Sequence, residues 1–145
     1  MMEHAQWQSL LTLGNECFHD KQLNQAEAFY WQAYDLLSLA CHEEPQSSDV
    51  LMAWICACHN LALLYETFGN LDLSLKFLMT PHEYLVAVSE SKHFNDDVKF
   101  TAFKGMGLTL PPILLFTKNH KICDGCREQL PLLEKIIAQA TSSIH

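Results

Sequence analysis

The chain has 145 residues, of which 49% are hydrophobic and 18% charged, and its 9 Lys and Arg against 17 Asp and Glu give a net charge of −8. This acidic balance argues against a broad nucleic-acid or anionic-membrane surface, because both need clustered Lys and Arg. No apolar run reaches the roughly 18 residues of a membrane helix, and the N-terminus lacks the basic-then-apolar layout of a signal peptide. We therefore expect one cytoplasmic domain over residues 1–145.

The first two elements are predicted helices that form a hairpin over about residues 6–40. Residues 6–19 place apolar side chains three and four positions apart, as an amphipathic helix does. A turn is expected around residues 19–23. Asn24 followed by Glu27 resembles the capping box that opens a helix. Small and aromatic residues then recur at helical spacing through Ala26, Tyr30 and Ala33.

The middle of the chain predicts a second hairpin over about residues 50–88. Asp49 can cap the third helix, about 50–68, which is apolar around much of its girth and should therefore be the most buried element. Gly69 should end this helix, because glycine is common just past a helix C-terminus. A fourth helix begins near Leu71, and Pro81 should either kink it or mark a stop and restart.

The last part of the chain predicts a third hairpin over about residues 96–142. Asp96 and Asp97 suit the first turn of a fifth helix, which Pro111 and Pro112 must break or kink. A turn follows at 119–125, and residues 128–140 have the pattern of an amphipathic sixth helix. No segment shows strand alternation, so the chain predicts an all-α fold of six helices in three antiparallel hairpins.

The first hairpin resembles a tetratricopeptide repeat (TPR), a helix-turn-helix unit of about 34 residues. Its matching positions are Trp7, Leu10, Leu13, Gly14, Leu23, Ala26, Tyr30 and Ala33. The second unit matches at Leu61, Ala62, Tyr65, Gly69 and Leu71, and departs at Ser74 and Pro81. The resemblance implies hairpins stacked as a short superhelix, whose concave groove binds a segment of another protein. The whole chain also resembles small stand-alone bacterial TPR proteins of unknown function.

The resemblance implies groove residues on the first, third and fifth helices. In some peptide-binding members, amides at the positions of Asn15 and Asn60 reach the backbone or carboxylate of the ligand, since an amide both donates and accepts. Lys99 and Lys104 are nearest to the cations of those members, although they lie five rather than four residues apart. The predicted groove comprises Asn15, Phe18, His59, Asn60, Leu63, Lys99 and Lys104. The alternative is that the amides bond locally and that aromatics such as Phe18 pack between repeats.

Two cysteine motifs offer other chemistry. Cys123 and Cys126 form a Cys-x-x-Cys pair after His120, which could share a metal or cycle as a disulfide. A closed zinc site needs about four ligands and no second pair exists, so we favour a plain turn. Cys56 and His59 are close enough on one helix to act as nucleophile and base, but no oxyanion hole or glycine-rich loop accompanies them.

The sequence therefore predicts a non-catalytic adaptor, without a cofactor, that binds a segment of a partner protein and neither nucleic acid nor a membrane. A type III secretion-type TPR chaperone and a self-associating scaffold, such as a homodimer, are the alternatives. A redox or metal-responsive role for Cys123 and Cys126 is the remote one.

Overall fold

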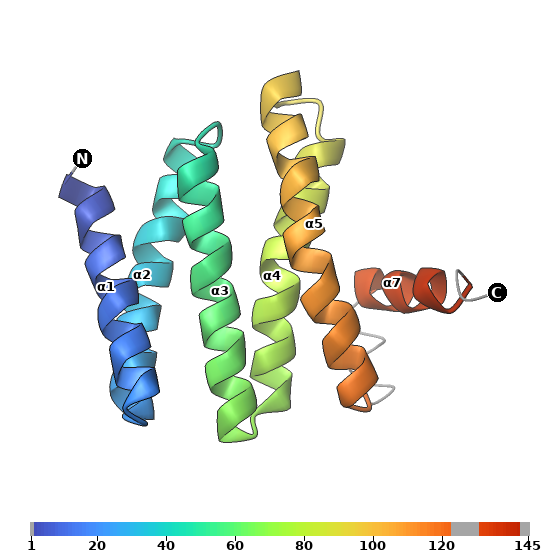
Figure 1. Cartoon of the computed structure of the whole chain (residues 1–145). Coiled ribbons are helices and arrows are strands. Elements are labelled where there is room, and N and C mark those ends of the chain that lie inside the picture. Colours follow the sequence, from blue (N-terminus) through green and yellow to red (C-terminus); the bar gives the residue numbers. More distant parts are fainter. Residues whose placement is uncertain (1, 123–130, 143–145) are drawn as a thin grey trace.

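The computed structural model describes residues 2–122 and 131–142. Within these ranges the chain forms six helices: α1 (Met2–His19), α2 (Leu23–Glu43), α3 (Ser48–Phe68), α4 (Leu71–Glu90), α5 (Asp96–Asn119) and α7 (Pro131–Ser142). No strand occurs in the same two ranges. The predicted all-α class is therefore confirmed. Figure 1 shows α1 to α5 standing in a row, with α7 lying across the far end beside α5.

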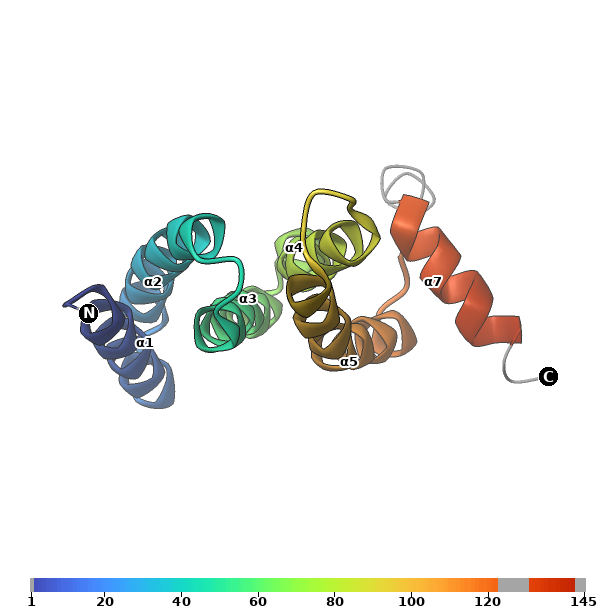
Figure 2. The same cartoon turned by 90° about the horizontal axis from the view of Figure 1, so that it is seen from above.

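The helices alternate between two layers. Seen from above in Figure 2, α1, α3 and α5 lie on one side of the row and α2 and α4 on the other. Each helix from α1 to α4 contacts the next one extensively, whereas α3 contacts α5, and α5 contacts α7, over short stretches only. As a consequence, α3 and α5 are neighbours in the same layer, and α4 packs behind both.

The buried side chains form two clusters, and α3 contributes to both. One cluster includes Leu37, Val50, Trp54, Leu85 and Val98, and the other includes Tyr30, Leu61, Leu64, Met79, Ile113 and Leu133. The buried residues of α3 number 11, more than in any other helix of the described part, as its apolar girth predicts.

Two helices, α3 and α5, are long and apolar enough to cross a membrane by length and composition alone. The core helix of a soluble protein satisfies the same criterion when it is mostly buried. The apolar window of α3 is 61% buried, which fits that description, whereas the window of α5 is only 28% buried. Much of the apolar surface of α5 is therefore exposed.

Helix α2 begins earlier than predicted. Lys21 has a φ of +65°, and the backbone N–H of Gln22 bonds to the carbonyl of Cys17 at 2.8 Å, which closes the turn after α1. Gln22 occupies the N-cap position without a side-chain hydrogen bond. The capping box predicted at Asn24 is therefore wrong, because Asn24 already lies within the helix.

The C-terminal end of α3 follows the predicted pattern, whereas its N-terminal end does not. Ser47, and not Asp49, caps the helix, because its Oγ accepts a hydrogen bond from the backbone N–H of Val50 at 3.3 Å. Asp49 lies within the first turn instead. At the other end Gly69 has a φ of +83°, the left-handed conformation of a C-terminal cap, as predicted.

The prolines do not interrupt the helices. Helix α4 continues through Pro81, so the predicted stop and restart is wrong there, and α5 continues through Pro111 and Pro112. A proline has no N–H to donate, so the carbonyls of Gly107 and Leu108 lose their usual donors one turn later. Figure 2 shows that the axis of α5 bends along its length, which agrees with the predicted kink.

Helices α1 and α2 approach each other closely at Gly14. A Cβ atom added to Gly14 would lie 2.5 Å from Cε1 and 2.6 Å from Cδ1 of Tyr30. Tyr30 is 2% exposed, and the nearby Ala33 of α2 is fully buried. The predicted role of small residues at this helix contact is therefore confirmed for Gly14.

Candidate functional site

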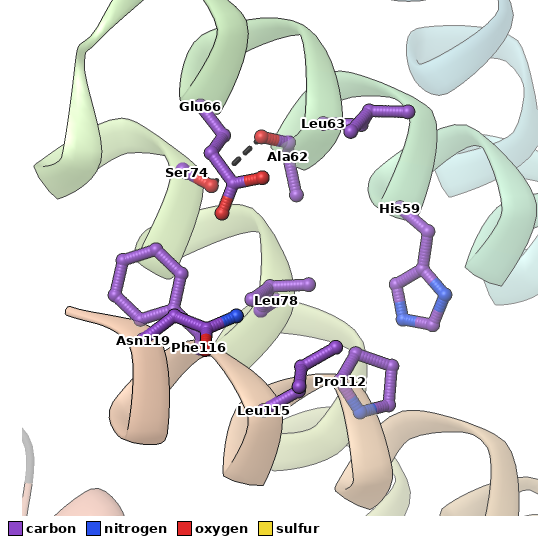
Figure 3. A pocket seen from close by; sticks show the side chains of 10 residues that line it. All are labelled: His59, Ala62, Leu63, Glu66, Ser74, Leu78, Pro112, Leu115, Phe116 and Asn119. Atoms are coloured by element: carbon purple, nitrogen blue, oxygen red, sulfur yellow. Dashed lines mark hydrogen bonds between the residues drawn. The ribbon is translucent and has the colours of Figure 1, made fainter.

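A pocket of about 210 Å³ lies where α3, α4 and α5 meet (Figure 3). Its lining residues are His59, Ala62, Leu63 and Glu66 of α3, Ser74 and Leu78 of α4, and Pro112, Leu115, Phe116 and Asn119 of α5. The residues from α3 and from α5 are spaced by three and four positions, which places each set on one face of its helix. Two helices of the same layer thus form the walls, and α4 closes the floor.

The walls and floor of the pocket are largely apolar. Leu63 is 51% exposed on the α3 side and Leu115 is 59% exposed on the α5 side. Leu78 and Phe116 are buried beneath them. On the floor, the hydroxyl of Ser74 donates a hydrogen bond of 2.7 Å to the carbonyl of Ala62, which ties α4 to α3.

Three polar side chains complete the pocket. His59 has a buried Nε2 that makes no hydrogen bond, and burial lowers the pKa of its imidazole. Glu66 places Oε2 3.0 Å from Nε2 of His120, and the amide of Asn119 is exposed. In Figure 3 the Glu66 carboxylate and Asn119 lie toward one end of the pocket and His59 at the other.

A second pocket, of about 270 Å³, lies between the first halves of α3 and α5. It is lined by Ser48, Leu51, Met52, Thr101, Lys104, Gly105 and Leu108. A Cβ on Gly105 would lie 3.0 Å from Leu85 and 3.7 Å from Ile55, so α5 approaches α3 and α4 closely beside this pocket. The two pockets follow each other along the same pair of helices. We refer to their lining residues together as the α3–α5 groove.

The structure brings the two predicted amides together between α1 and α3. Oδ1 of Asn15 accepts a hydrogen bond of 2.7 Å from the hydroxyl of Tyr30 and one of 3.4 Å from Nδ2 of Asn60. Because this carbonyl oxygen accepts both bonds, the NH₂ group of Asn15 remains as a donor. The pair lies on the side of α3 that faces α1, next to the α3–α5 groove.

The remaining predicted groove residues are spread over the molecule. His59 and Leu63 line the first pocket, and Lys104 lines the second, with Nζ 5.0 Å above the ring of Phe100. Lys99 is half-buried near the start of α5. Phe18 is partly buried against the second core cluster, which agrees with the alternative in which this aromatic ring packs inside the protein. The seven predicted residues therefore do not form one continuous cluster.

Sequence reasoning missed Glu66, Leu115 and Asn119. Glu66 lies three residues after Leu63 and seven after His59, so extending the helical period from the two predicted residues would have found it. Leu115 and Asn119 carry no such signal, because their place opposite α3 depends on how α5 packs.

Cys123 and Cys126 of the predicted Cys-x-x-Cys pair lie outside the described residues. His120 is described and pairs with Glu66. Within residues 2–122 and 131–142, no three His, Cys, Asp or Glu side chains are grouped so that they could hold a metal ion.

The cysteines of the first four helices differ in exposure. Burial raises the pKa of the Cys41 thiol to about 12 and also raises that of Cys58, which favours the unreactive thiol form. Cys56 is exposed on α3 and forms no hydrogen bond with His59. The spacing that suggested a nucleophile and base is thus not accompanied by a hydrogen bond between them.

A family model described as "Protein of unknown function (DUF2753)" matches residues 5–145. No curated protein matches the chain, and neither does any solved structure.

Proposed function

We propose that this chain, which belongs to the DUF2753 family, is a non-catalytic adaptor that binds a segment of a partner protein in the α3–α5 groove. The proposal includes a TPR-like architecture, with hairpins α1–α2 and α3–α4 stacked as a short superhelix that α5 continues, whereas α7 lies across α5 and departs from the predicted third antiparallel hairpin. The alternation of layers in Figure 2 and the close approach at Gly14 support it. We further propose that the protein is cytoplasmic, uses no cofactor and binds neither a membrane nor nucleic acid.

The observation that carries the proposal is the row of exposed apolar side chains along the groove. Met52 and Leu63 of α3 face Leu108 and Leu115 of α5, and all four are exposed although they are large and hydrophobic. Contiguous apolar surface that the chain itself leaves uncovered marks an interaction site.

The test compares two leucines that are exposed to a similar degree in different layers. Leu63 lies in the groove and is 51% exposed, whereas Leu39 of α2 is 60% exposed on the opposite layer. Lysine at either position should leave the free energy of unfolding within about 0.5 kcal/mol of the wild type. The tagged wild type and both variants serve as baits in a lysate of the source cells, and co-purifying proteins are identified by mass spectrometry.

We expect partners that the wild type and Leu39→Lys retain and that Leu63→Lys loses. Light scattering on the purified proteins shows whether the retained partner is a second copy of the chain. If Leu63→Lys captures the same proteins in the same amounts as the wild type, the groove is not the binding surface.

A further inference from the structure

We infer that the partner segment anchors itself with a basic side chain, arginine or lysine, that enters the pocket between α3, α4 and α5 and pairs with the carboxylate of Glu66. This inference rests on the proposed function, because it specifies what the α3–α5 groove takes. Four features of the pocket support it: its volume, its apolar walls, the acceptors at its polar end and its negative charge.

The size of the pocket suits one long side chain. Its volume of about 210 Å³ is below the range of about 300–1,000 Å³ typical of small-molecule sites. The apolar walls of Leu63, Leu78 and Leu115 lead toward the polar end. Lysine and arginine combine an apolar stem with a charged head, so their stems can lie along such walls while the head reaches polar groups.

The polar end of the pocket is suited to a cationic head group. Glu66 engages Oε2 with His120, which leaves its second carboxylate oxygen to accept further hydrogen bonds. The Asn119 side chain beside it is exposed and makes no hydrogen bond within the described residues, so its carbonyl oxygen is a second acceptor. A guanidinium or ammonium group carries only donors and would satisfy both acceptors at once.

The charges around the pocket select for a cation. Among the described residues that line the pocket, Glu66 is the only carboxylate and none is lysine or arginine. Burial keeps the pKa of His59 low, so at neutral pH the imidazole at the other end is uncharged and does not repel a cation. An acidic anchor would be repelled by Glu66, and the chain as a whole carries a net charge of −8.

The experiment starts from a random peptide library displayed on phage and selected on the immobilised wild-type protein. Enriched sequences are synthesised with a fluorescent label, each in two forms that differ at one basic residue: arginine, or the uncharged isostere citrulline. Fluorescence anisotropy then gives the affinity of both forms for the wild type, Glu66→Gln and Glu90→Gln. Glu90 is an exposed carboxylate at the end of α4, so its variant has the same net charge as Glu66→Gln without touching the pocket.

We expect the wild type and Glu90→Gln to prefer the arginine form by about ten- to a hundredfold, and Glu66→Gln to bind both forms alike. Peptides whose binding Leu63→Lys abolishes, but that bind the wild type equally well as arginine and citrulline forms, would overturn the basic anchor and leave the groove in place. So would an arginine preference that Glu66→Gln retains. A library that yields no binder sensitive to Leu63→Lys would overturn the proposed function as well. Self-association that Leu63→Lys abolishes would identify a second copy as the occupant and contradict a free basic segment.

Discussion

Replacing Gly14 with alanine adds one methyl group at the contact of α1 and α2. The new Cβ would lie 2.5 Å from Cε1 of Tyr30, whereas carbon atoms in ordinary contact are about 3.5–4.0 Å apart. The ring edge must therefore retreat by about 1 Å. Tyr30 is 2% exposed, and its hydroxyl is held by Asn15 at 2.7 Å, so the ring has little room to move.

Two opposing effects set the size of the change. Alanine is a better helix former than glycine by about 1 kcal/mol. Overpacking a well-packed contact costs about 1–3 kcal/mol, and a ring fixed at both ends belongs at the upper limit. We therefore expect Gly14→Ala to lower the free energy of unfolding by about 2 kcal/mol, which for a chain of this size lowers Tm by about 8 °C.

The assay is urea unfolding followed by far-UV circular dichroism, with a thermal melt beside it. Gly107→Ala in α5 is the matched control, because no atom lies within 4 Å of the Cβ that it would add. That variant should be stabilised by about 0.5–1 kcal/mol through helix propensity alone. In a Tyr30→Leu background, the cost of Gly14→Ala should disappear because the ring edge is gone.

A Gly14→Ala variant that is as stable as the wild type, or more so, would refute this reasoning. It would mean that α1 and α2 do not approach at Gly14, and the support that this contact gives to a TPR-like first hairpin would be lost.

Three further predictions concern a cap, a buried histidine and an amide. Gly69→Ala should lower the free energy of unfolding by about 1–2 kcal/mol, because a Cβ is disfavoured at a φ of +83°; an unchanged Tm contradicts it. Burial lowers the pKa of His82 from 6.5, so the unfolded chain binds the proton first and stability, full above about pH 6.5, should fall as the pH drops below it. The urea concentration at half-unfolding, measured at a series of pH values, checks this prediction. Its decrease at low pH should be smaller in His82→Gln than in the wild type. Asn60 lies outside the α3–α5 groove and bonds Asn15 at 3.4 Å, so Asn60→Ala should leave the affinity of a selected peptide unchanged; a loss of about five- to a hundredfold, the equivalent of roughly 1–3 kcal/mol, would extend the binding surface to the α1 side of α3.

The sequence predicts features that depend on neighbours along the chain. The helical period and Gly69 place five helices to within a few residues, because the spacing of apolar side chains reflects the face that each helix buries. Sequence patterns are a weaker guide where tertiary packing decides whether a helix continues. Pro81 is buried among other helices, and that packing holds α4 continuous where a proline alone predicts a break.

The candidate site shows the same division. His59 and Leu63 can be predicted from α3 alone, because they share one face of the helix. Their opposite wall, Leu115 and Asn119, lies about 50 residues further along the chain and meets α3 only because α4 packs behind both helices. No spacing rule within one helix reports that pairing.

Helix α3 has the most buried residues of the described helices and belongs to both core clusters, as α2, α4 and α5 also do, and this bears on how the molecule opens. Because the clusters share these helices, neither can lose its packing without exposing part of the other. The amide hydrogens of α3 should consequently exchange with solvent only on global unfolding, while those of α7, which contacts α5 over a short stretch, should exchange by local opening. A segment bound between α3 and α5 would then bridge the slowest-exchanging helix and one that is largely exposed, and would slow exchange in α5 more than in α3.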